Sequence, residues 1–265
     1  MRKVKRVFLI FNFLLLIFIL LNTISYAAVK VEPARIIMNS KLDTRTTGVI
    51  NVVNNGDSQV FLQAYLYDWT EDKTESLITR NPGELDSSLY NHIKFNPRSF
   101  ILEPGQKQVV RFTITTPEDL EQELRGIVFF EEEISYSEEG TGARVITQVG
   151  TVIYLVPENV KYHFKLNEIR FKAQTESENM SSLILMENKG DAHIRYELEY
   201  KIIDSNSRLI EEGSLGEKII IPTFERGVII NFENRLNPGD YKLLLSYNFI
   251  NNNEQKSYEI PFKVK

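Results

Sequence analysis

Hydrophobic residues recur along this chain in short runs with a period of two, which is the spacing of half-buried β-strands. The clearest run follows a turn signal at residues 102–105, where Pro and Gly favour chain reversal. Val110, Phe112 and Ile114 lie on one face of that run, and a more polar set lies on the other. Few stretches have helical spacing, so the pattern predicts an all-β protein built from sandwiches.

The same alternation, interrupted by Asn, Gly, Asp and Pro, predicts most of the strands. Two flank the turn at 102–105, and a short edge strand is expected at 76–79. The others are predicted at residues 29–38, 48–53, 60–69, 127–136, 143–156, 161–171, 182–187, 193–203, 209–214, 218–221, 227–233, 241–249 and 257–264. Pro33 lies inside the first strand and cannot donate a ladder hydrogen bond. That strand is therefore expected at a sheet edge or at a switch between sheets.

A repeated turn sequence suggests two similar sandwiches in tandem. Asn54-Asn55-Gly56-Asp57 is a strong hairpin signal, and Asn188-Lys189-Gly190-Asp191 recurs 134 residues later, also between two strands. Chance recurrence stays open as an alternative, because such turns are common. Residues 157–158 mark the linker, which predicts domains at 28–157 and 158–265. Tyr241, after Asn-Pro-Gly-Asp, predicts a tyrosine corner whose phenol bonds back to the main chain.

The first 27 residues have the features of a signal peptide. A basic start is followed by an apolar run over residues 7–21 and by small residues at the −3 and −1 positions of a site after Ala27. The alternative is an uncleaved anchor, but the run is short against the roughly 20 residues that a spanning helix needs. No later stretch is long and apolar enough to span a membrane. The sequence therefore predicts an exported protein.

Charge and cysteine content narrow the functional classes. Residues 1–27 hold four Lys/Arg and no Asp/Glu, so the rest has 27 basic and 36 acidic residues, a net charge of −9. That balance argues against nucleic acid as a partner. The chain has no cysteine, so no disulfide is possible, and its stability must come from core burial.

No catalytic constellation is evident. His92, His163 and His193 are scattered over different predicted elements, and no metalloprotease, nucleophile-elbow or phosphate-loop motif is present. The acidic residues at 131–133 and 138–139 are interpreted as a solvated strand end, because consecutive strand residues point to opposite faces. We therefore expect no enzyme, no metal, no cofactor and no small-molecule substrate. A carbohydrate-binding module would need exposed aromatic residues, and Trp69, Tyr65 and Tyr67 share one strand face. A buried sandwich tryptophan is the preferred interpretation.

The order of elements over residues 95–130 resembles the N-terminal domain of periplasmic pilus-assembly chaperones, an immunoglobulin-like family. The resemblance covers residues 29–160 best and the second domain in outline. It implies an exported chaperone that lends a strand to an incomplete pilus or fimbrial subunit, with an outer-membrane usher as a further candidate partner. It also implies a periplasmic location, or the cell surface in an organism with one membrane. The alternative is a structural or adhesive surface protein without chaperone activity.

Two features of that family are carried over by position. Arg35, in the first strand, matches the cleft arginine that binds a subunit's terminal carboxylate. Val152 stands where the family has a partner lysine. The lent strand matches alternating small residues, Ala143, Val145, Thr147 and Val149. Because the family usually lends bulkier apolar residues, either the subunit's groove is shallow or this relative does not donate a strand.

Overall fold

The computed structural model describes residues 29–40, 44–72, 76–132 and 148–265, and every regular element in these ranges is a β-strand. None of the described segments forms a helix of the length and hydrophobicity that membrane crossing requires. The predicted signal peptide lies outside the described residues. The strands are β1 (Val29–Glu32), β2 (Arg35–Asn39), β3 (Arg45–Asn54), β4 (Val60–Glu71), β5 (Leu77–Arg80), β6 (Ile93–Asn96), β7 (Ser99–Leu102), β8 (Lys107–Thr115), β9 (Leu124–Glu132), β10 (Gln148–Val156), β11 (Phe164–Lys172), β12 (Ser181–Asn188), β13 (Ile194–Asp204), β14 (Leu209–Ile220), β15 (Glu225–Asn231), β16 (Gly239–Phe249) and β17 (Glu254–Val264).

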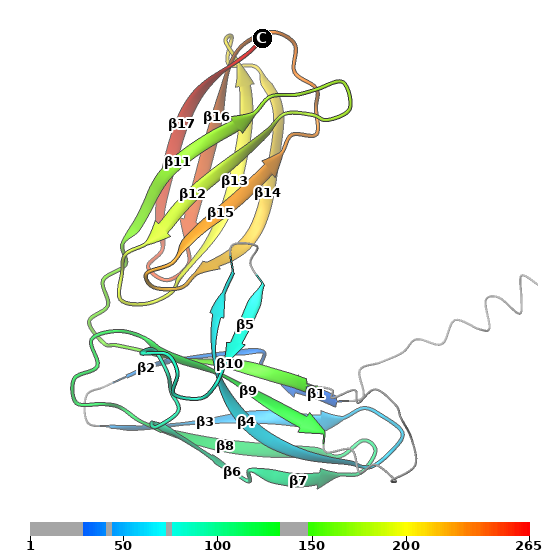
Figure 1. Cartoon of the computed structure of the whole chain (residues 1–265), viewed down its shortest axis with the longest axis vertical. Coiled ribbons are helices and arrows are strands. Elements are labelled where there is room, and N and C mark those ends of the chain that lie inside the picture. The colour runs from blue at the N-terminus through cyan, green and yellow to red at the C-terminus, as the bar shows by residue number, and fades with distance from the viewer. Residues whose placement is uncertain (1–28, 41–43, 73–75, 133–147) are drawn as a thin grey trace, which may run out of the picture.

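The strands form two immunoglobulin-like sandwiches, which confirms the predicted fold class (Figure 1). In the first sandwich, one sheet has the order β1-β3-β8-β6. The other has the order β2-β10-β9-β4-β5, with β7 also paired to β4. Val110, Phe112 and Ile114 of β8 are buried in the core between the sheets, as the period-two pattern predicts. The second sandwich packs β11-β12-β15 against β14-β13-β16-β17 around its own core.

The first predicted strand is divided at Pro33, where the chain changes sheets. β1 pairs antiparallel with β3, and β2 pairs parallel with β10 in the opposite sheet. β1 and β2 are each the outermost strand of their sheet, so Pro33 lies at a sheet edge and at a switch between sheets. This position suits proline, which has no backbone N–H to donate to a neighbouring strand. The carbonyl of Pro33 accepts a hydrogen bond from the Thr151 hydroxyl of β10 at 2.6 Å.

The turn at Asn54 is not a hairpin, so that prediction was wrong, and the similar turn at Asn188 is not a hairpin either. β3 and β4 lie in different sheets, as do β12 and β13, so each turn carries the chain across its sandwich. Asn54 and Asn188 make matching bonds there. In each case the side-chain amide donates to two backbone carbonyls, and its oxygen accepts from the glycine amide two residues later. The same turn chemistry at matching places supports the tandem relation.

The second sandwich has one further correction and one confirmation. Residues 209–214 and 218–221 were predicted as separate strands, but residues 209–220 form a single strand, β14, whose pairing with β13 is shifted near Glu197. Gly216, with φ of +67°, lies at that irregularity, which explains the break in the sequence pattern. The Tyr241 hydroxyl donates to the carbonyl of Asn237 at 2.9 Å, so the tyrosine corner is confirmed.

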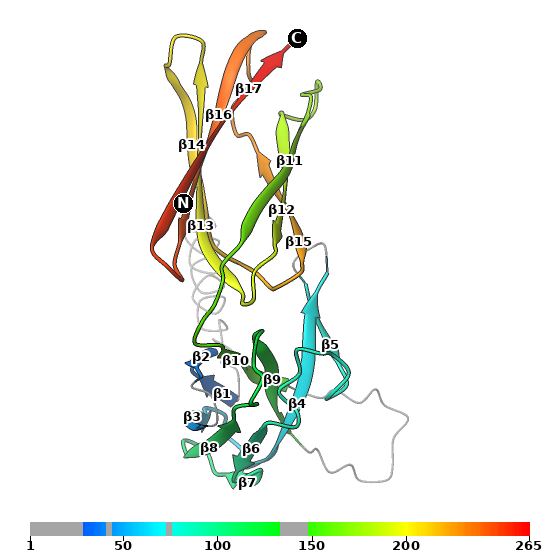
Figure 2. The ribbon, with the colours of Figure 1, turned by 90° about the vertical axis from the view of Figure 1, so that its left-hand side faces the viewer.

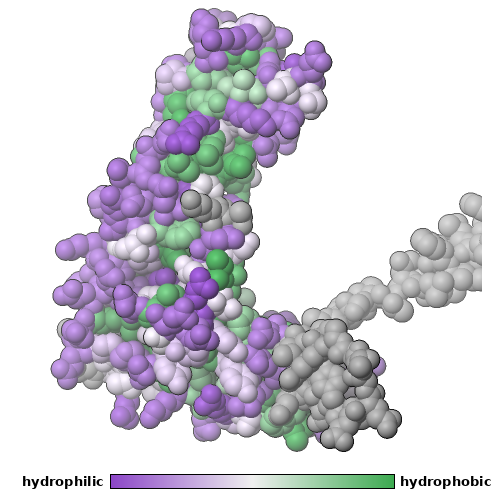
Figure 3. Space-filling model, viewed as in Figure 1, coloured by the Kyte–Doolittle hydropathy of each residue, from purple (hydrophilic) through white to green (hydrophobic). Residues whose placement is uncertain are grey.

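The two sandwiches meet end to face, and their strands run in different directions (Figures 1 and 2). The outer face of the β2-β10-β9-β4 sheet meets one end of the second sandwich. A third apolar cluster fills the junction, and its buried members are Trp69, Ile127, Tyr154, Val156, Ala192 and Ile221. Hydrophilic residues cover most of the face seen in Figure 3, with hydrophobic residues in patches. The sheet is thus covered on both faces, which explains the nearly continuous apolar run in β4.

Candidate functional site

Strand β10 has an open edge at its beginning. It pairs with β9 along its whole length, from Gln148 onward, but β2 covers its other side only from Val152 onward. Successive residues of a strand point their backbone amide and carbonyl groups to opposite sides. Val152 points its amide toward the side where β2 lies, so Gln148 and Gly150 point theirs to the same side, where β2 leaves the edge uncovered. Among the described residues, no strand pairs with that side. An extended segment from another chain could add there.

Arg35 lies where β2 begins, across from Val152, and it projects toward the second sandwich. Its Nη1 donates to Oε1 of Glu217 in β14 at 2.8 Å. Arg195 of β13 binds the same carboxylate through two bonds, with Nε to Oε1 and Nη2 to Oε2 both at 2.9 Å. One carboxylate therefore joins two guanidinium groups at the cleft between the sandwiches. The three side chains remain partly accessible, at 35% for Arg35, 35% for Glu217 and 23% for Arg195.

This contact should make stability depend on pH at the acid end. The hydrogen bonds from Arg195, then those from Arg35, lower the pKa of Glu217 from 4.5 to about 2. A carboxylate with a depressed folded-state pKa stabilises the fold fully above about pH 4.5, and this contribution is lost as pH falls through 2. We expect the difference in unfolding free energy between the wild type and Glu217→Gln to be at most about 1 kcal/mol at pH 6, because the group is part-exposed. It should shrink toward pH 2. Urea titrations across this range measure it, and a difference that grows at low pH would contradict the assignment.

A buried polar cluster lies deeper in the junction. Glu123 of the first sandwich and His193 of the second are both fully buried. The Glu123 carboxylate accepts from the backbone amide of His193 at 3.0 Å and binds its Nδ1, while the Glu123 amide donates to the carbonyl of Asp191 at 2.8 Å. Arg125 Nη1 lies 4.0 Å from the same carboxylate. This cluster bridges the two sandwiches.

Rings enclose that cluster. The Tyr154 ring lies against the His193 ring with centroids 4.1 Å apart and planes tilted by 34°, and the Arg125 guanidinium lies 5.6 Å from the centroid of Trp69. Burial lowers the pKa of Arg125, and the Glu123 carboxylate opposes that shift. Burial also raises the pKa of Tyr154, with a further contribution from Glu123. Because these surroundings exclude water, each polar contact is stronger and the loss of any partner costs more free energy.

The hairpin of β4 and β5 forms a second bridge between the sandwiches. β4 extends beyond its sheet, and in Figures 1 and 2 the hairpin reaches the second sandwich beside β15. Glu71, at the end of β4, forms an ion pair with Arg226 of β15. Asp68, buried in the same strand, accepts from the amide of Leu85 at 2.9 Å and from the hydroxyl of Ser88. The hairpin is therefore bonded to the second sandwich through Glu71 and to its own sandwich through Asp68.

The residues predicted to form the lent strand fall partly within the described chain. Val149 lies in β10, where its half-buried side chain packs against the first core. Ala143, Val145 and Thr147 lie outside the described residues. Val152, at the position of the family lysine, is partly buried against the junction cluster. The structure thus brings Arg35 beside Val152 and the beginning of β10, although Arg35 is far from β10 in the sequence.

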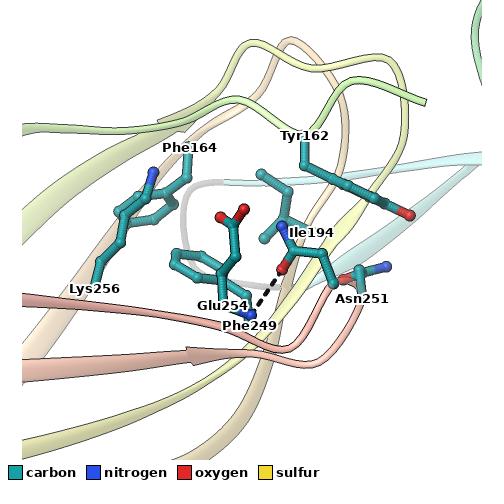
Figure 4. Close-up of a pocket in the computed structure, with 8 residues that line it drawn as sticks. Tyr162, Phe164, Ile194, Phe249, Asn251, Glu254 and Lys256 are labelled. Carbon is teal, nitrogen blue, oxygen red and sulfur yellow. Dashed lines mark hydrogen bonds between the residues drawn. The ribbon is translucent and has the colours of Figure 1, made fainter. Parts of the chain in front are cut away.

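The other candidate groups do not converge. His92, His163 and His193 are on separate elements, and no metal-binding group of His, Asp or Glu occurs in the described ranges. Trp69 is buried in the junction and Tyr67 binds Glu131, so these two aromatic residues are not a sugar platform. Figure 4 shows a small hollow in the second sandwich, lined by aromatic rings, Ile194, Glu254, Lys256 and asparagines. Its volume of about 10 Å³ is room for one water molecule, not a substrate.

Several residues that shape the cleft were not predicted from the sequence. The charged residues Glu217, Arg195, Glu123, Glu71 and Arg226 lie in strand or loop patterns, and each contacts a residue far away in the chain. Glu217 is 182 residues from Arg35. No local motif distinguishes these charges from solvated ones. The sequence signal that could have found one of them is the charge of Glu217 beside the bulge at Gly216 in β14, and that signal is weak.

Comparison with known proteins finds similar structures but no matching family model or curated sequence. No family model and no curated protein sequence matches the chain. The chain is similar to the class 5 fimbriae chaperone CfaA, at 12% identity and TM-score 0.48, covering 89% of this chain and 99% of that one. It is similar to the CsuC–CsuE chaperone–tip subunit complex of Acinetobacter baumannii, at 12% identity and TM-score 0.49, covering 88% and 98%. It is also similar to the Salmonella enterica SafA pilin–SafB chaperone complex, at 13% identity and TM-score 0.45, covering 91% and 99%.

Proposed function

We propose that this chain is an exported, non-enzymatic chaperone that holds a pilus-type or fimbrial-type subunit by strand donation. The observation that supports it best is the open edge of β10 at Gln148 and Gly150, which ends beside Arg35 in the cleft. An exposed backbone edge pairs readily with another extended chain. An uncovered edge is a liability in a protein with no client, so the open beginning of β10 favours a partner strand.

Strand addition gives the proposed complex both its affinity and its specificity. Main-chain bonds from the β10 edge hold the subunit, and alternating side chains enter its open groove. Of the predicted set Ala143, Val145, Thr147 and Val149, we propose that the first three are those side chains, because Val149 packs against the protein's own core. They are small, so they suit a shallow groove. The subunit gains cover for an apolar surface that would otherwise aggregate.

The proposed cellular role follows from the same reasoning. Residues 1–27 are proposed to be removed on export, and the boundary between the working domains is proposed at Pro157. The protein would act in the periplasm, or at the cell surface in an organism with one membrane. An outer-membrane usher is a candidate acceptor of the complex. The rival is a structural or adhesive surface protein, which would use no β10 edge and would release no subunit.

Gln148→Pro tests the edge directly. The amide of Gln148 faces the uncovered side, so proline removes a donor that only a client strand would use. The Gln148 side chain binds Glu131 at 2.7 Å, and Gln148→Ala removes that contact while keeping the amide, so it is the matched control. The subunit that co-purifies from the native host is first identified and then co-expressed with each variant. We expect at least a tenfold lower yield of complex with proline than with alanine, at equal melting temperatures.

Two further variants separate the chaperone from its rival. Arg35→Ala should weaken subunit capture, and Arg111→Ala, an exposed strand arginine away from the cleft, should not. Val145→Asp should place an unpaired charge in the subunit's groove and also abolish capture. A large drop in melting temperature for Val145→Asp would place that residue in the protein's own core. Full capture by Gln148→Pro and Arg35→Ala would favour the structural or adhesive protein.

A further inference from the structure

β15 is an open edge strand of the second sandwich. It is the outer strand of the β11-β12-β15 sheet and pairs with β12, and in the part of the chain that the structure describes no strand lies along its other side. The amide of Phe232, just after β15, donates to the carbonyl of Met180, which precedes β12. Continued along the strand, this alternation points the backbone groups of Gly227 and Ile229 outward, to the open side.

The other three sheet edges of the second sandwich carry features that discourage pairing, and β15 does not. The pairing registers of β11 and β14 are shifted by bulges, and β17 contains Pro261 and two lysines. The register between β15 and β12 is unbroken, and the sequence of β15, ERGVIIN, has no lysine and no proline. Natural sheets blunt their exposed edges in these ways because an unprotected edge pairs with another chain. The edge of β15 is therefore suited to strand addition.

The outer face beside this edge is apolar. Ile229 is 58% exposed, which is the largest exposed fraction among the large hydrophobic residues of the described chain. It pairs with Leu183 of β12, and Gly227 pairs with Leu185. A Cβ atom on Gly227 would lie 3.2 Å from Cδ1 of Leu183 and 3.4 Å from Cδ2 of Leu185, so the two leucines border the space above the glycine. This face is turned toward the viewer in Figures 1 and 3, and hydrophobic residues interrupt the hydrophilic surface there.

We propose that two copies of this chain form a dimer by pairing their β15 strands antiparallel about a two-fold axis at Val228. Val228 is the middle residue of β15, so this register uses the whole strand. Ile229 of each copy then lies opposite the partner's Gly227, where it enters the space above the glycine and contacts the partner's Leu185. The pairing joins two three-stranded sheets into one continuous sheet and covers the exposed isoleucine of each copy.

The polar ends of β15 agree with the same register. Glu225 begins the strand and Asn231 ends it, and both are exposed. The antiparallel register places the carboxylate of one copy opposite the amide of the other. This carboxylate accepts a hydrogen bond from the Asn167 amide at 2.9 Å and has further acceptor positions for a second donor. Parallel pairing in register would instead oppose the two Glu225 carboxylates, which is unfavourable.

Sedimentation velocity tests the dimer, and thermal melts check that each variant is folded. A single pair of edge strands is a small interface, so the dimer should be weak and the range to cover is about 1 to 500 μM. We expect a concentration-dependent dimer for the wild type, a monomer for Ile229→Lys and at least tenfold weaker association for Gly227→Ala. The matched control is Leu209→Lys, which places the same charge at a 47% exposed residue of the edge strand β14 and should dimerise as the wild type does.

A cysteine cross-link tests the register, because the chain has no cysteine of its own. Val228→Cys places two thiols at directly opposed positions with Cα atoms about 4.5 Å apart, within the reach of a disulfide. Ile230→Cys is the control, since Ile230 is buried on the same face of β15. The register leaves its two copies more than about 10 Å apart, which no disulfide spans. We expect mild oxidation to cross-link Val228→Cys at least tenfold faster than Ile230→Cys.

The outcomes separate this dimer from the proposed function, because the β10 edge lies in the first sandwich. A monomeric wild type over the whole range, or equal cross-linking of the two cysteine variants, would overturn the proposal. A dimer that survives Ile229→Lys but is lost in Gln148→Pro would place the interface at β10 and would also overturn it. A monomer that loses capture of a different polypeptide in Ile229→Lys would assign the β15 edge to that partner and not to a second copy.

Discussion

Replacing Glu123 with alanine should lower the free energy of unfolding by about 3–5 kcal/mol, the cost of breaking a buried, charged partnership. The carboxylate is fully buried and binds both the amide and the ring of His193, with Arg125 at 4.0 Å. Alanine leaves these groups in the dry junction without their acceptor. The junction should loosen as well, because the contact joins the two sandwiches.

Urea unfolding measures the loss, and small-angle scattering measures the orientation of the sandwiches. Glu121→Ala is the matched control, since Glu121 is exposed two residues away on the same connection and should cost less than about 0.5 kcal/mol. We also expect Glu123→Ala to separate one unfolding transition into two. A loss below about 1 kcal/mol with unchanged scattering would show that the apolar cluster alone holds the junction.

Asn188→Ala should destabilise the second sandwich by about 3 kcal/mol, taking about 1 kcal/mol for each of three hydrogen bonds. The buried amide donates to the carbonyls of Ala192 and Ile220 at 2.8 and 2.9 Å, and its oxygen accepts from the amide of Gly190 at 2.9 Å. These bonds tie the turn to the end of β14.

The matching change in the first sandwich provides an internal comparison. Asn54 donates to Ser58 and Leu102 carbonyls at 2.7 and 3.1 Å, so Asn54→Ala should cost a similar amount in that sandwich. Asn206→Ala, in the exposed turn between β13 and β14, is the control and should change little. Hydrogen exchange locates each loss. An effect of Asn188→Ala that is no larger than that of Asn206→Ala would mean that the turn does not depend on its side chain.

Local patterns determined the fold class and most strands of this protein. Alternation placed Val110, Phe112 and Ile114 in a core, because a strand with one buried face imposes period two. Pro33 marked a sheet switch, since it lacks a donor. Tyr241 marked a corner because its turn sequence is specific. These features depend on residues close together in the chain.

The pairing of sheets and the contents of the cleft depended on the tertiary structure. The turn at Asn54 suits a hairpin as well as a crossing between sheets, and only the sheet partners of β3 and β4 decide between them. Charges such as Glu217 and Glu123 have no local pattern, because their partners belong to the other sandwich. The open edge of β10 exists because β2 begins at Arg35. Alternation and turns are local properties of the sequence, whereas contacts between distant residues arise only when the sandwiches pack together.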